Sequence, residues 1–149
     1  MSLLQKIDDD LKTAMKASDA VKVSVLRMAK AALKNKEIDK RDTLSEDDIL
    51  SVLSSLSKQT RESIEQFAKG GREDLADKER RELSVLQTYL PKELTQEELN
   101  SIITEAIRES SAESLKDIGN VMRLVMPRVR GAADGQVVNQ RVRALLEKM

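Results

Sequence analysis

Apolar residues recur at intervals of three and four positions along almost the whole chain. This spacing places side chains on one face of an α-helix, and the alternation typical of strands does not persist anywhere. The pattern therefore predicts an all-α fold. The expected helices span residues 3–17, 20–38, 45–69, 72–89, 95–110, 115–126 and 135–148.

Glycine and proline residues divide these helices into two groups. Gly70 and Gly71 follow the third helix, and glycine ends helices readily because it adopts the left-handed conformation at little cost. Two long helices joined by so short a turn are expected to form an antiparallel hairpin. Pro91 ends the fourth helix. We therefore expect an N-terminal helical domain with a long antiparallel helix hairpin over residues 1–91, and a small three-helix C-terminal domain over residues 92–149.

Short polar motifs mark several helix ends. Ser45 with Asp48, and Thr95 with Glu98, have the spacing of a capping box, in which two residues satisfy each other's backbone N–H groups. Pro127 is expected to stop or kink the sixth helix, because proline has no N–H to donate.

Composition limits the chemistry. The chain has no histidine and no cysteine, so the commonest general base, the best nucleophile and a zinc site of the usual kind are absent. There is no glycine-rich phosphate loop, and we expect no cofactor, no metal and no catalytic residue. No apolar run is long enough to span a membrane, and the N-terminus lacks signal-peptide features. We therefore expect a cytoplasmic protein without a membrane partner.

Charge is distributed unevenly although the chain is neutral as a whole. Residues 93–117 carry seven acids and two bases, a formal charge of −5, whereas residues 118–149 carry six bases and two acids, a formal charge of +4. Such a separation is typical of a surface that has a charged partner. The alternative is that the arginines offset the acidic helix at residues 95–110 within the same domain.

Arginines at the basic end are the candidates for binding RNA. Arg128 and Arg130 directly precede the last helix, guanidinium groups bind phosphate in a bidentate manner, and a helix N-terminus favours anions. Asp134 opposes this arrangement, since its carboxylate would cap the same N–H groups. The candidate residues are Arg123, Arg128, Arg130, Gly131, Gly135, Arg141 and Arg143.

A second basic face lies on the helix at residues 20–38. Arg27, Lys30 and Lys34 follow one another at helical spacing, on the side away from the apolar positions. A solvated face and a phosphate-facing stripe are both compatible with this pattern.

Four motifs in order along the chain resemble the YqeY family, whose members are similar to the C-terminal tail of the B subunit of glutamyl/aspartyl-tRNA amidotransferase. The resemblance covers essentially the whole sequence. The motifs lie in residues 26–38, 61–75, 89–91 and 119–135.

The resemblance implies an N-terminal helical domain followed by a tail-like domain that grips the body of tRNA. It suggests Arg128, Arg130 and the Gly131–Gly135 turn as the RNA contacts. The large B-subunit cradle and the Ser-Lys glutaminase centre of the A subunit have no counterpart in this sequence, which argues against catalysis by this chain alone.

The leading hypothesis is a non-catalytic accessory protein that binds tRNA, or another folded RNA, through its C-terminal domain. Phe67 and Tyr89 are the two aromatic residues, so we expect recognition of shape and backbone rather than base stacking. The alternatives are a helical protein–protein adaptor and a component of a glutamine-dependent tRNA amidotransferase, a carbon–nitrogen ligase. A DNA-binding role at Asn139–Arg141 ranks lower.

Overall fold

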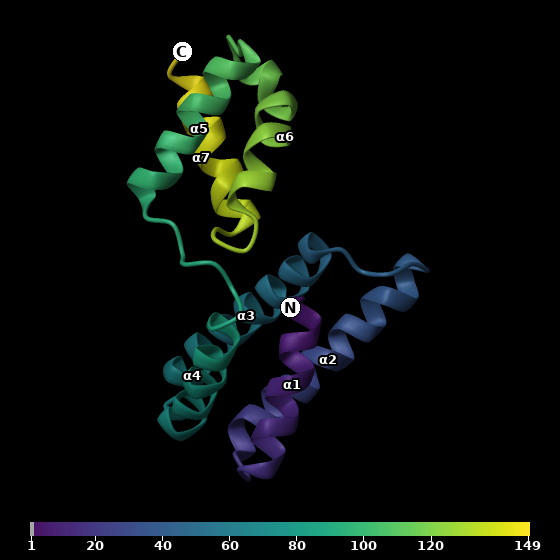
Figure 1. The fold of residues 1–149 in the computed structure, drawn as a ribbon. Coiled ribbons are helices and arrows are strands. Elements are labelled where there is room, and N and C mark those ends of the chain that lie inside the picture. Colours follow the sequence, from purple (N-terminus) through teal and green to yellow (C-terminus); the bar gives the residue numbers. More distant parts are fainter. Residues whose placement is uncertain (1) are drawn as a thin grey trace. The chain divides into compact units, whose positions relative to one another are not determined.

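The computed structural model describes residues 2–149, and this part of the chain consists of helices joined by short connections, with no strand (Figure 1). The all-α prediction is confirmed. The helices are α1 (Leu3–Lys16), α2 (Ala20–Lys40), α3 (Glu46–Lys69), α4 (Glu73–Gln87), α5 (Gln96–Ser110), the 3₁₀ turn η1 (Leu115–Asp117), α6 (Ile118–Val129) and α7 (Gly135–Glu147).

The chain forms two compact units, the first ending at Pro91 and the second spanning Lys92–Met149. In the first unit, α3 and α4 pack extensively against each other across the turn at Gly70 and Gly71. Gly71 has a φ of +75°, a conformation that side-chain-bearing residues adopt only with strain. The apolar faces of the four helices meet in one core, formed by Ile7, Val25, Leu26, Ala29, Leu33, Ile49, Leu53, Leu86 and Tyr89.

The capping box predicted at the start of α3 is present. Asp48 N–H donates to Ser45 Oγ at 3.1 Å, and Ser45 N–H donates to Asp48 Oδ2 at 2.9 Å. The same carboxylate accepts a hydrogen bond from Lys40 Nζ, at the end of α2, at 2.5 Å. The hydrogen bond from Lys40, with that from the Ser45 backbone, lowers the pKa of Asp48 to about 2. One carboxylate thus joins the end of α2 to the start of α3.

Tyr89 lies just beyond the end of α4, and its hydroxyl donates to Asp10 Oδ2 on α1 at 2.5 Å. The side chain is 8% exposed, and Lys6 Nζ lies 5.4 Å from the centre of the ring. Burial, together with the hydrogen bond to Asp10, raises the pKa of the Tyr89 phenol. This contact fixes α1 against the end of the α3–α4 pair.

In the second unit, α5, α6 and α7 pack against one another around an apolar core. Leu94 N–H donates to the Ala132 carbonyl at 2.9 Å, which joins the start of the unit to the turn before α7. The core residues are Leu99, Ile103, Ala106, Ala112, Val121, Val125, Val129, Val138, Val142 and Leu146.

The sixth helix differs from its prediction at both ends. It begins with the 3₁₀ turn at Leu115–Asp117, and it continues through Pro127 to Val129 instead of ending at residue 126. Pro127 is exposed and its missing N–H costs one helical hydrogen bond on that side. Val125 and Val129 are fully buried, so continuing the helix places one more valine in the core.

Candidate nucleic-acid interface

The exposed side of α6, taken with the residues that flank the helix at its two ends, carries cations and no acid. Six positions at helical spacing share this side, opposite the buried valines. Lys116 belongs to the 3₁₀ turn before α6 and Arg130 directly follows the helix; Arg130 is half-buried and the other five are exposed. Neither Arg123 nor Arg130 has a hydrogen-bond or ion-pair partner within residues 2–149. We call this surface the basic face of α6; it consists of Lys116, Gly119, Asn120, Arg123, Pro127 and Arg130.

Gly119 is exposed on the basic face of α6, and a Cβ built there would meet no atom within 4 Å. Glycine inside a helix destabilises it by about 0.5–1 kcal/mol relative to alanine. Nothing packed within the second unit requires its small size. The glycine therefore leaves the helix backbone open to close approach from outside.

Arg128 points away from this face and pairs with the acidic helix α5. Its Nη2 atom donates to Glu109 Oε2 at 2.6 Å, and the two side chains are 38% and 42% exposed. This contact is the within-domain charge offset that the sequence left as an alternative. An exposed pair of this kind stabilises a fold by less than about 1 kcal/mol.

The turn before α7 has a structural reason for one of its two glycines. Gly131 has a φ of +80°, which favours glycine, whereas a Cβ on Gly135 would make only ordinary contact, at 3.7 Å, with the Met126 terminal methyl. Asp134 Oδ1 accepts the Gln136 N–H at 3.1 Å, so an anion already caps the start of α7. The turn is therefore less suited to phosphate than the basic face of α6.

The arginines of α7 are engaged within the second unit. Arg141 Nε donates to Asn100 Oδ1 on α5 at 2.5 Å, and its side chain is half-buried. Arg143 is exposed and its Nε donates to Asn139 Oδ1 at 3.1 Å, one turn earlier on the same helix. Of the predicted candidates, the structure brings Arg123 and Arg130 together on one surface. Sequence analysis missed Lys116 and Gly119, although their spacing from Arg123 places all three on one helix face.

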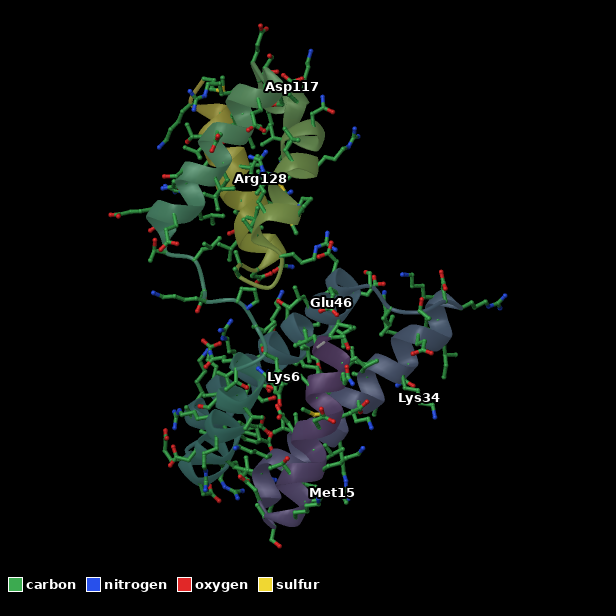
Figure 2. The ribbon with its side chains drawn as sticks, viewed as in Figure 1. Lys6, Met15, Lys34, Glu46, Asp117 and Arg128 are labelled. Atoms are coloured by element: carbon green, nitrogen blue, oxygen red, sulfur yellow. The ribbon has the colours of Figure 1, made fainter. Side chains whose placement is uncertain are left out.

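In the first unit, the predicted basic face of α2 is only partly available. Lys30 Nζ forms an ion pair with Asp8 Oδ1 at 2.7 Å. Arg27 and Lys34 are exposed and form no ion pair with another described residue. In Figure 2 the Lys34 side chain extends outward from α2.

The first unit also has a groove of about 380 Å³ between α1, α4 and the start of α2. Its polar lining includes Asp10, Asp19 and Lys22. No group of three or more acidic side chains within residues 2–149 is arranged to hold a metal ion. None of the helices in that range is both long and apolar enough to cross a bilayer.

These features define a class of small, two-unit helical proteins with an exposed basic helix face. The chain belongs to the YqeY family: the family described as "Yqey-like protein" matches residues 4–146.

Several fungal proteins named "Altered inheritance of mitochondria protein 41, mitochondrial" are similar to this chain. The protein of Vanderwaltozyma polyspora is 45% identical over 82 residues, which cover 54% of this chain and 44% of the relative. That of Eremothecium gossypii is 43% identical over 88 residues, covering 58% and 48%. That of Pyrenophora tritici-repentis is 27% identical over 147 residues, covering 97% and 81%. The chain thus spans just under half the length of the first two relatives.

These names correct one expectation from the sequence. The relatives are named as mitochondrial proteins, so the prediction of a cytoplasmic location is wrong on this comparison. It rested on cysteine usage and on the absence of secretory features, and neither property separates the cytoplasm from mitochondria.

Proposed function

We propose that this chain is a non-catalytic accessory protein that binds folded RNA through the basic face of α6. The observation that supports the proposal is a set of three cations, Arg123 on α6 with Lys116 just before and Arg130 just after the helix, with no acid on that side. Affinity for nucleic acid comes largely from such phosphate contacts. The proposed site excludes the capped turn before α7.

The geometry of the basic face of α6 suits contact with the sugar–phosphate backbone of RNA more than contact with a base. Arg123 and Arg130 are seven residues apart, or about 10 Å along the helix axis, so they would contact separate phosphates. Gly119 and Asn120 present little bulk between the cations, which allows a sugar–phosphate chain to approach closely. RNA helices are recognised mainly by shape and by backbone contacts of this kind. Transfer RNA is our first choice of ligand because of the resemblance to the amidotransferase tail.

The test is a titration of the full chain with tRNA at several salt concentrations, followed by fluorescence anisotropy. The double variant Arg123→Ala/Arg130→Ala should bind more weakly, and the slope of log K against log salt should become shallower by about 1.8, or about 0.9 per lost contact. Arg108→Ala is the matched control, since Arg108 is an exposed arginine of α5 outside the basic face. Equal affinity and equal slope for the wild type and the double variant would refute the proposed site.

A protein–protein adaptor is a second candidate function, because α2 exposes two large apolar residues, Met28 and Ile38, that nothing in the first unit covers. The proposal of RNA binding does not depend on it.

A further inference from the structure

Helix α2 is apolar on two opposite sides. One side supplies Val25, Leu26, Ala29 and Leu33 to the core of the first unit, where each is at most 2% exposed. Met28 and Ile38 lie on the other side and are 40% and 62% exposed. Covering these two exposed apolar side chains with a partner would remove apolar surface from water.

Exposed residues on this side of α2, three of them apolar and two polar, follow the repeat of a coiled coil. Five exposed residues are separated by four, three, four and three positions, an average of 3.5, which is the heptad spacing of helices that pair. At about 100° per residue, they form a stripe on the side opposite the buried residues. We call this stripe the exposed seam of α2; it consists of Ser24, Met28, Ala31, Asn35 and Ile38.

The C-terminal turns of α2 are exposed to solvent, but an ion pair joins their end to α3. Every residue from 34 to 40 is exposed, and Figure 1 shows this part of the helix pointing away from α1. The ion pair between Lys40 and Asp48, at 2.5 Å, fixes the end of the helix to the capping box of α3. This contact restrains the end of the helix that carries the seam, which lowers the entropy lost when a partner docks.

Cations border one side of the seam. Arg27 and Lys34 stand seven residues apart beside it, on the same side of the helix. No ion pair joins Arg27 or Lys34 to another residue within the described range. In paired helices such flanking positions select the partner by charge. A helix complementary to this flank would have acids along its facing side.

A second copy of this chain matches the seam less well. An antiparallel copy would place the basic flank against itself. A parallel copy would place Arg27 against Ala32 and supply one acid, Asp39, against Lys34. Nucleic acid also fits less well, because it would leave Met28 and Ile38 uncovered.

We propose that the exposed seam of α2 docks an amphipathic helix of a partner protein, with apolar residues facing the seam and glutamate or aspartate facing Arg27 and Lys34. Helix-in-groove recognition of this kind depends on a few apolar anchors at heptad spacing. Met28 and Ile38 serve as the anchors on this chain, and the cations fix the register and orientation of the partner.

The test uses two labelled synthetic peptides of three heptads. Both have leucine at the seam positions, and the flanking positions are glutamate in one and lysine in the other. The wild-type chain should bind the glutamate peptide at least tenfold more tightly. The double variant Arg27→Glu/Lys34→Glu should reverse this preference. Lys36→Glu, an exposed change of charge on another side of the same helix, should retain the wild-type preference.

The apolar anchors are tested separately. Met28→Ser/Ile38→Ser should weaken binding of the glutamate peptide at least tenfold, whereas Met15→Ser, at an exposed methionine of α1, should not. Circular dichroism checks that the variants remain helical. The proposal is overturned if the wild type binds both peptides equally. It is also overturned if sedimentation shows a wild-type dimer that Ile38→Ser dissociates, or if Arg27→Glu/Lys34→Glu abolishes tRNA binding that Met28→Ser/Ile38→Ser leaves intact.

Discussion

Tyr89 offers a direct test of the packing of the first unit, because it is the single tyrosine of the chain and there is no tryptophan. The absorbance of tyrosinate therefore reports on this residue alone. In the structure the ring is 8% exposed and the hydroxyl donates to Asp10 Oδ2 at 2.5 Å. Ionising the phenol would remove this hydrogen bond and place a second negative charge against the carboxylate of Asp10.

The size of the expected loss of stability at high pH follows from the raised pKa of Tyr89, which is due first to burial and then to the hydrogen bond with Asp10. A group whose pKa is higher in the folded state stabilises the fold fully below its unfolded pKa of about 10, and this contribution decreases as the pH rises toward the folded pKa. The free energy of unfolding should fall by about 1.4 kcal/mol for each pH unit above 10, from this residue alone.

The assay compares urea unfolding of the wild type and Tyr89→Phe between pH 7 and 11. The phenylalanine keeps the ring but has no proton to lose, so subtracting its curve removes the effect of lysine titration. At pH 7 the variant should be less stable by about 1.5 kcal/mol, the lower end for a hydrogen bond to a charged group, since Asp10 is only half-buried. Tyrosinate absorbance appearing with a midpoint near 10, while the helical signal is unchanged, would refute the packing argument.

Three further predictions concern other contacts. Gly119→Ala should raise the free energy of unfolding, measured by urea titration, by about 0.5–1 kcal/mol. It should also weaken tRNA binding, because the added methyl group obstructs approach of the RNA to the helix backbone. Unchanged affinity for tRNA would contradict close approach of the RNA at Gly119. Arg128→Ala and Glu109→Ala should each cost less than about 1 kcal/mol by the same measurement, and a larger loss would mean that their ion pair is structural. The Asp48 carboxylate, whose pKa is lowered from 3.8 to about 2, stabilises the fold above pH 4, and this contribution should disappear as the pH falls toward 2. Ser45→Ala should lower the free energy of unfolding by about 1 kcal/mol at neutral pH. Acid titration of the wild type and of Ser45→Ala, followed by circular dichroism, checks both expectations.

Local signals in the sequence predicted much of the helical layout. The capping box at Ser45 and the N-cap at Asp134 are present, because both depend on hydrogen bonds between residues two or three positions apart. Pro127 shows where a local rule is insufficient. Its missing N–H predicted a helix end or a kink, but burial of Val129 favours one more turn.

The charged residues show more clearly which features local sequence signals predict and which depend on tertiary contacts. The sequence located the arginines and the acidic helix, and it left open whether they bind a partner or each other. The structure pairs Arg128 with Glu109 and Arg141 with Asn100, contacts that join residues 19 and 41 positions apart. It leaves Arg123 and Arg130 on an open face.

By itself, the sequence determined the helical class, the family and the absence of histidine and cysteine chemistry, since these follow from composition, spacing and short-range hydrogen bonds. Only the tertiary structure decided which cations are neutralised and which apolar residues stay uncovered. Both depend on which helices come to lie side by side. Helical periodicity separates the buried and exposed sides of each helix, but it does not state that α2 would keep a second apolar side, with Met28 and Ile38, in solvent.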